Sequence, residues 1–91
     1  MSETSNFYFY VLQSQRTGKY YKGHCSDLTK RLSEHNHGRT KSTKHGVPWD
    51  VVHVEEFSSR EAAVLREKEC KTRHGGFVLL KQIKNKTGKD D

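Results

Sequence analysis

The amino-acid sequence predicts an α/β (α+β) fold in which a three-stranded antiparallel sheet is flanked by helices, in the order β-β-α-β-α-α. Two aromatic runs flank a glycine-containing turn, a β-branched run follows later, and three segments have helical spacing or caps. No glycine-, proline- or serine-rich linker interrupts the 91 residues, so we expect one domain over residues 7–84. Residues 1–6 and the polar tail 85–91 are expected to be flexible.

The first two strands are predicted to pair as a hairpin. Phe7–Leu12 is continuously apolar or aromatic, which is typical of a strand buried on both faces. Ser14–Gly18 has the composition of a longer hairpin loop, and Lys19–Gly23 follows with two more tyrosines.

The first helix is expected to cover Leu28–Asn36. Ser26 or Asp27 can cap its start, and Gly38 can end it in the left-handed conformation. Residues 38–49 combine small, polar and basic residues with the only proline and show no periodicity, which predicts a mobile basic loop.

The third strand is expected at Asp50–Phe57, because this run is β-branched and has the length of a strand. Strict alternation along it would place Val52 and Val54 on one face and Val51 and His53 on the other.

Two helices complete the predicted fold. Ser58 and Glu61 fit a capping box, so a second helix should begin there and continue to about Arg73. The glycine pair 75–76 is expected to break it, and a short third helix should follow over residues 77–84.

Positive charge is concentrated in one third of the chain. The net charge is +6, and residues 15–45 hold eight basic side chains against two acidic ones. Such a field attracts polyanions by releasing their counterions, so nucleic acid is the expected partner; a surface that only aids solubility is the alternative. The eight are Arg16, Lys19, Lys22, Lys30, Arg31, Arg39, Lys41 and Lys44.

Other classes of protein receive little support. Cys25 and Cys70 lie far apart and no apolar leader precedes the domain, so a cytoplasmic protein with reduced thiols is expected. No run approaches the ~20 apolar residues that cross a bilayer, and no membrane role is expected. His24 and the nearby histidines match no common zinc spacing, and the sequence has no Walker or Gly-x-Ser-x-Gly motif.

Three kinds of side chain are candidates for chemistry, although each also has an ordinary structural explanation. Arg31 and His35 share a helix face, either as a phosphate clamp with a proton carrier or as solvated side chains. Glu67 is either a ligand of Mg²⁺ or the i,i+4 ion-pair partner of Lys71. The hairpin tyrosines either pack in the core or accept a proton where nearby cations stabilise the phenolate. They are Tyr8, Tyr10, Tyr20 and Tyr21.

Taken in order, these residues resemble the GIY-YIG nuclease superfamily, in particular its small stand-alone bacterial members. Tyr8-Phe9-Tyr10 matches the first motif, and Tyr21-Lys22-Gly23 matches the second, with its tyrosine eleven residues after Tyr10. Arg31 follows ten residues later at the position of the family arginine, and His35 stands four further on.

The second half of the chain continues the resemblance. Pro48-Trp49 precedes a strand, and Glu61-Ala62 and Glu67 match the second helix of the family. Tyr8 and Lys22 depart from the usual motif residues without removing a catalytic side chain. The asparagine found late in many family members has no match, because Asn85 lies too far along the chain.

The resemblance implies a GIY-YIG-like sheet with an active site on its concave face, and it implies roles for five residues. Glu67 would hold Mg²⁺ or Mn²⁺, and Arg31 would stabilise charge on the phosphate. One tyrosine would activate water and the other would bind phosphate. We favour Tyr10 as the activating group and Tyr21 as its partner, although the roles can be exchanged, and His35 would assist proton transfer.

The sequence therefore leaves two main hypotheses about function open, and a structural interaction protein is a third. The first is a metal-dependent endonuclease acting on DNA, with RNA as an alternative substrate and a monomer assumed. The second is a nucleic-acid-binding module with weak or no cleavage, which would use the loop Gly38–His45. The presence of Arg31, His35 and Glu67 together favours cleavage, since a carboxylate facing phosphate needs a cation between them. The predicted DNA contacts are Lys22, Lys30, Arg39, Lys41 and Lys44.

Overall fold

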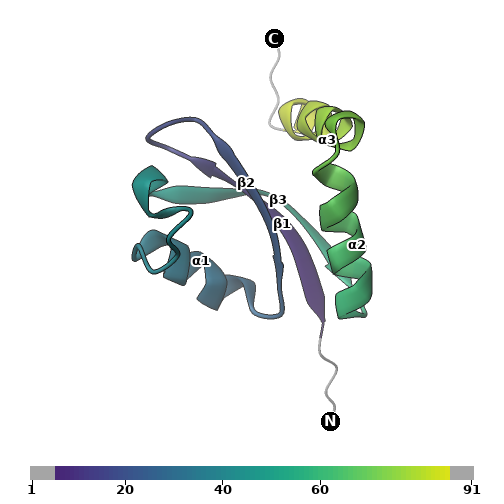
Figure 1. Cartoon of the computed structure of the whole chain (residues 1–91), viewed down its shortest axis with the longest axis horizontal. Coiled ribbons are helices and arrows are strands. Elements are labelled where there is room, and N and C mark those ends of the chain that lie inside the picture. Colours follow the sequence, from purple (N-terminus) through teal and green to yellow (C-terminus); the bar gives the residue numbers. More distant parts are fainter. Residues whose placement is uncertain (1–5, 87–91) are drawn as a thin grey trace.

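A central antiparallel sheet separates one helix on one side from two helices on the other (Figure 1). The computed structural model of the chain describes residues 6–86. The elements are β1 (Phe7–Ser14), β2 (Tyr20–Cys25), α1 (Leu28–Asn36), a 3₁₀ turn (Lys44–Gly46), β3 (Trp49–Phe57), α2 (Arg60–Cys70) and α3 (Arg73–Lys86). The predicted fold class and element order are confirmed.

Strand β1 is the middle strand of the sheet, whose order is β2-β1-β3. Its alternating side chains enter two separate hydrophobic clusters, as expected for a strand buried on both faces. Phe9 and Val11 belong to the cluster on the α2 and α3 side, whereas Tyr10 and Leu12 belong to the cluster on the α1 side. The first cluster adds Cys70, Leu79 and Ile83, and the second adds Cys25 and Trp49.

The predicted alternation along β3 is wrong because the strand contains a β-bulge. The register against β1 shifts at Val52, which has no partner on β1. Val51 packs on the α1 side, while Val52 and the ring of His53 both lie against the core on the α2 side. Val54 pairs with Tyr10, so it does not share a face with Val52 either.

The predicted start and end of α2 need correction. Ser59, and not Ser58, is the N-cap, since its side chain accepts a hydrogen bond from the Ala62 amide. The helix ends at Cys70, three residues before the predicted end at Arg73. A cap motif read from sequence can be displaced by one residue when two serines are adjacent.

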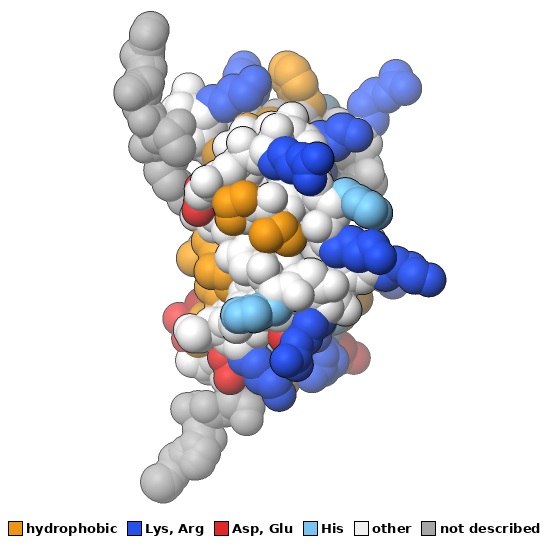
Figure 2. Space-filling view, turned by 90° about the vertical axis from the view of Figure 1, so that its left-hand side faces the viewer, with side chains coloured by type: hydrophobic (Ala, Val, Ile, Leu, Met, Phe, Trp, Pro, Cys, Tyr) orange, Lys and Arg blue, Asp and Glu red, His pale blue; other side chains and the backbone are white. Residues whose placement is uncertain are grey.

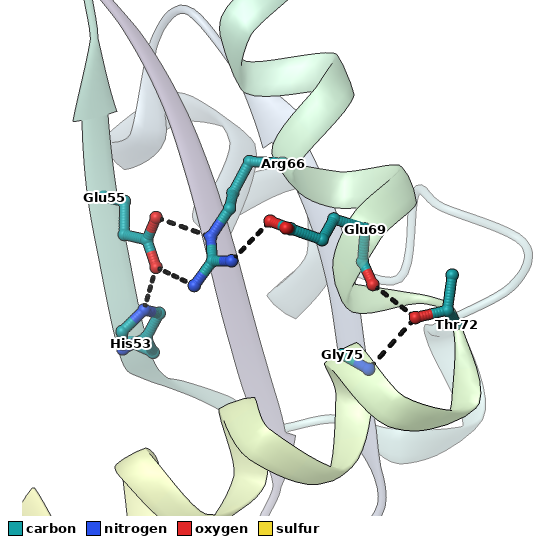
Figure 3. A network of polar contacts seen from close by, with 6 residues as sticks. All are labelled: His53, Glu55, Arg66, Glu69, Thr72 and Gly75. Atoms are coloured by element: carbon teal, nitrogen blue, oxygen red, sulfur yellow. Dashed lines mark hydrogen bonds and ion pairs between the residues drawn. The ribbon is translucent and has the colours of Figure 1, made fainter.

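The glycine pair does not break a helix but lies inside the first turn of α3. The hydroxyl of Thr72 accepts a hydrogen bond from the Gly75 amide at 3.0 Å, as a cap does (Figure 3). A Cβ atom on Gly75 would come within 2.0 Å of the carbonyl oxygen of Glu69. The glycine is therefore required for α3 to begin directly against the end of α2.

Helix α2 is attached to β3 through Arg66, as Figure 3 shows. The guanidinium donates to both carboxylate oxygens of Glu55, at 2.8 and 3.0 Å, and to Glu69 at 2.7 Å. Nε2 of His53 lies 2.7 Å from Glu55, on the other side of that carboxylate. Burial opposes ionisation of Glu55, but the hydrogen bonds from Arg66 and His53 hold its pKa below the ordinary value.

The segment 38–49 was predicted to be an irregular mobile loop, and this is wrong for its second half. Lys44–Gly46 forms a 3₁₀ turn, and Thr43 is buried. The indole of Trp49 donates to the Thr43 carbonyl at 2.8 Å, and the Ser14 hydroxyl donates to Gly46 at 2.6 Å. Such short turns have no periodicity in the sequence, so only the tertiary contacts show them.

The remaining boundaries differ by a few residues. β1 and β2 each run two residues beyond their predicted ends, and α3 extends past residue 84 to Lys86. Residues 1–5 and 87–91, which hold most of the predicted flexible ends, lie outside the described residues. Within residues 6–86, no helix has both the length and the apolar character needed to cross a membrane.

Replacing Ser59 with alanine should lower the free energy of unfolding by about 1 kcal/mol, because the Ala62 amide loses its capping acceptor. Ser58→Ala is the matched control and should change stability by less than about 0.5 kcal/mol. Urea denaturation of the three proteins measures both values. Equal losses would show that the cap is assigned to the wrong serine.

Candidate active site

A pocket of about 260 Å³ opens along β2, an edge strand of the sheet. Its walls come from β1, β2, the start of α1 and helix α2, and α1 and α2 lie on opposite sides of the sheet (Figure 1). The pocket therefore spans the sheet edge. The resemblance implied instead an active site on one concave face of the sheet. Its principal side chains are Tyr10, Tyr21, His24, Arg31, Arg60 and Glu67.

Tyr10 reaches this pocket from the buried middle strand. Its side chain is only 2% exposed, and a Cβ atom on Gly23 would stand 2.7 Å from its hydroxyl oxygen. The glycine of the second motif thus leaves the space that the Tyr10 hydroxyl occupies. Burial, followed by the nearby Tyr21, raises the pKa of Tyr10, so a free phenolate is disfavoured there.

His35 lies behind Tyr10, on the buried side of α1. Its Nε2 atom is 3.1 Å from the Tyr10 hydroxyl, and its Nδ1 atom is 2.7 Å from the Thr43 hydroxyl. Burial and then the charge of Arg31 lower the pKa of His35, which favours a neutral ring with one donor and one acceptor nitrogen. The three side chains form a continuous hydrogen-bonded chain from the pocket into the core.

Tyr21 is half-buried and lines the pocket beside Tyr10. The edge of its ring meets His35, with centroids 5.1 Å apart, and it also contacts Trp49 at 6.4 Å. These contacts hold the ring, while its position in the wall of the pocket makes it accessible from solvent.

Arg31 lines the pocket from α1, a helix that Asp27 caps by accepting a hydrogen bond from the Lys30 amide. Its side chain is 44% exposed, and Nη1 lies 3.6 Å from Glu34. An ion pair this long and this exposed is weak. The guanidinium therefore remains free to bind an anion.

Glu67 faces the same pocket from the opposite helix, held by two donors. His24 Nδ1 lies 2.6 Å from one carboxylate oxygen, and Lys71 Nζ lies 2.6 Å from the other. Burial opposes ionisation, but these hydrogen bonds and charges hold the pKa of Glu67 below its ordinary value. The ion pair expected between Glu67 and Lys71 is thus present, at the wall of a pocket that also holds Arg31.

The residues at this pocket fit Mg²⁺ or Mn²⁺ better than a metal that needs a full protein cage. Within residues 6–86, no group of three or more His, Cys, Asp or Glu side chains is placed to hold a metal. Mg²⁺ is commonly bound by one or two carboxylates, with waters and substrate phosphates completing its shell. Each oxygen of the ionised Glu67 still has acceptor capacity beyond its present hydrogen bond.

Figure 2 shows basic side chains on the side of the molecule that α1 occupies in Figure 1. Four of the five basic residues predicted to contact DNA belong to α1 and the segment after it. They are Lys30, Arg39, Lys41 and Lys44, and all four are exposed. Lys22 is separated from them. Its Nζ atom would be 3.5 Å from a Cβ atom on Gly76, so this side chain extends toward α3 on the other side of the sheet.

Two pocket residues, His24 and Arg60, were missed from the sequence. The sequence suggests His24 only as a zinc ligand, although alternation along β2 places it on the face opposite Tyr21, toward α2. Arg60 stands seven residues before Glu67, and residues two helical turns apart share a face. Strand alternation and helical spacing can both be read from the sequence, but without the fold neither distinguishes a site residue from a surface residue.

Comparison with known proteins identifies the family of the chain. The model of the GIY-YIG catalytic domain family matches residues 6–77. The chain belongs to the GIY-YIG family. The match confirms the resemblance read from the motifs. GIY-YIG domains are of the nuclease type and act on nucleic acids.

Small bacterial proteins are among the similar sequences. A UPF0213 protein of Listeria welshimeri is 39% identical over 72 residues, which cover 78% of this chain and 79% of the relative. One from Streptococcus agalactiae is 35% identical over 81 residues, covering 86% and 91%. The solution NMR structure of a UPF0213 protein from Bacillus halodurans has 30% identity and a TM-score of 0.53, covering 85% of this chain and 84% of that chain.

Thr43→Val should destabilise this GIY-YIG domain by about 1–3 kcal/mol, because the buried Nδ1 atom of His35 loses its polar partner. Thr43→Ser keeps the hydroxyl and should cost less. Denaturant unfolding at neutral pH compares the two. A larger loss for serine than for valine would mean that packing of the methyl group matters and the hydrogen bond does not.

Acidification should remove the stabilisation that Glu67 contributes. Its pKa in the folded state lies below the ordinary value of 4.5, so the contribution is present above that pH and is lost as the pH falls through the lowered pKa. The difference in unfolding free energy between wild type and Glu67→Gln should therefore be largest near pH 7 and should shrink below about pH 4. A difference that stays constant over this range contradicts the lowered pKa.

Proposed function

We propose that this GIY-YIG domain is a metal-dependent endonuclease that hydrolyses phosphodiester bonds in DNA. The observation that carries the proposal is the meeting of Arg31 and Glu67, from helices on opposite sides of the sheet, at one pocket that also contains Tyr10 and Tyr21. A cation and an ionised carboxylate on two walls of a polar pocket suit a phosphate and a metal ion side by side.

Glu67 would hold Mg²⁺ or Mn²⁺, and the ion, when bound, would act as a Lewis acid on the phosphate. Arg31 would bind the non-bridging oxygens and stabilise the charge that grows on them as the water attacks. The hydroxyl of Tyr21 would donate a hydrogen bond to the same phosphate from the half-buried wall of the pocket.

Tyr10 and His35 would together accept the proton of the attacking water. Because burial raises the pKa of Tyr10, a phenolate formed in advance is costly. A relay avoids this cost: the Tyr10 oxygen takes a proton from water while its own proton passes to Nε2 of His35, 3.1 Å away. The Thr43 hydroxyl supports this direction, since it can accept the Nδ1 proton and leave Nε2 as the acceptor.

A nucleic-acid-binding module without cleavage is the second candidate, and the exposed basic face in Figure 2 is the observation that favours it. Glu67 argues for cleavage instead. Its lowered pKa keeps it negative, and a negative group beside a phosphate repels it unless a cation lies between the two. A module that only binds nucleic acid has no use for an ionised carboxylate in this pocket, whereas a nuclease uses it to hold the metal.

Purified protein incubated with supercoiled plasmid and with branched or single-stranded DNA tests the proposal. Nicking is expected with Mg²⁺ or Mn²⁺ and should stop with chelator, and Glu67→Gln and Arg31→Ala should each slow it by at least about 100-fold. Asp50→Asn is the control, because it removes an exposed carboxylate on the opposite edge strand. If wild type and both site variants nick alike, the site is wrong; binding without any nicking favours the binding module.

A further inference from the structure

Two arginines on α2 have different surroundings. The guanidinium of Arg66 is occupied by Glu55 and Glu69, so it serves to attach the helix to the sheet (Figure 3). Arg60 forms no ion pair with any carboxylate of residues 6–86, and it lines the active-site pocket. No carboxylate of these described residues therefore neutralises its charge.

The Arg60 guanidinium is nevertheless held in place. Its central carbon lies 4.9 Å from the centroid of the Phe7 ring, a cation–π contact between the first turn of α2 and the start of β1. Stacking on an aromatic face leaves the N–H groups at the edge of the guanidinium free to donate. An exposed arginine ordered in this way loses less entropy when it binds an anion.

The position of Arg60 sets the distance at which it can act. It precedes Glu67 by seven residues, which places it on the same face of α2 and about 10 Å away along the helix axis. Arg31 approaches the pocket from the other side of the sheet. If a phosphate binds between Arg31 and a metal ion held by Glu67, Arg60 is offset from it toward the start of α2, where a neighbouring phosphate of the same strand would be within reach.

We propose that Arg60 is a positioning residue that binds a backbone phosphate flanking the scissile one. This inference rests on the proposed function, since it takes the scissile phosphate to lie at Arg31 and Glu67. The substrate strand then follows α2 from Glu67 toward the start of the helix, and the planar guanidinium binds phosphate oxygens in a bidentate manner. Contacts with flanking phosphates fix the register of the strand and carry no base specificity.

Kinetics and binding with Arg60→Gln test the role. KM should rise about 10-fold with kcat within about twofold, because the contact is made equally in the ground state and the transition state. Binding to duplex DNA is measured with Glu67→Gln present to prevent cleavage. The salt slope, which is the slope of the logarithm of the binding constant against the logarithm of the salt concentration, should fall in magnitude by about 0.9, the value for one lost phosphate contact. With Arg60→Lys, the salt slope should return most of the way to the wild-type value, whereas KM should return only part of the way.

The control is Lys68→Gln, which removes one positive charge from an exposed position on the same helix that does not line this pocket. It should leave KM unchanged. Equal effects of Arg60→Gln and Lys68→Gln on KM and on the salt slope would mean that only the overall field matters, and the proposal would be overturned.

Substrates with a single neutral methylphosphonate linkage locate the contact. The effect of Arg60→Gln should disappear when the neutral linkage replaces the flanking phosphate and should persist when it stands elsewhere. An effect that persists at every linkage overturns the proposal. If the wild type does not cleave at all, the proposed function fails, and the salt slope and methylphosphonate series in binding assays still decide the role of Arg60.

Discussion

The bidentate contact of Arg66 with Glu55 is the interaction on which the geometry of the site depends most. It joins α2 to β3 across a surface where half-buried charges would otherwise be unpaired, and His53 and Glu69 complete the partners of the two groups. Such pairs contribute more to geometry than to net stability, because desolvation offsets much of their attraction. By fixing how α2 lies on the sheet, this pair also fixes Glu67, the next residue along the helix.

The other half of the site depends on the middle strand. Because β1 is buried on both faces, consecutive side chains anchor different layers: Phe9 packs under α2 and α3, and Tyr10 packs under α1. The Tyr10 hydroxyl reaches the edge of the sheet only where β2 carries Gly23, since any side chain there would occupy the same space. The spacing between the two motifs therefore has a steric reason. Tyr10 and Gly23 are directly paired partners in the β1–β2 register.

The sequence predicts the element order, the first helix and the two-sided burial of β1 because each depends on local periodicity and capping. It fails where tertiary contacts decide. The bulge at Val52, the glycine pair inside α3 and the turn after Thr43 all arise from one segment meeting another. The same limit applies to the candidate site. Spacing predicts Arg31 and Glu67 as site residues, but the presence of His24 and Arg60 in the same pocket follows only from the way α2 lies over β2.

Among residues 6–86, the charges around the pocket neutralise one another only in part. Glu67 is matched by Lys71 and His24, so the carboxylate contributes little net field at a distance, yet it remains ionised and able to bind a metal. The positive field of Arg31 and Arg60 is then left to act on an anion. A lone carboxylate in the same place would repel the backbone that the basic face attracts. In the proposed mechanism, the local pairing of Glu67 thus allows one small domain to combine attraction for a polyanion with a carboxylate that holds the metal.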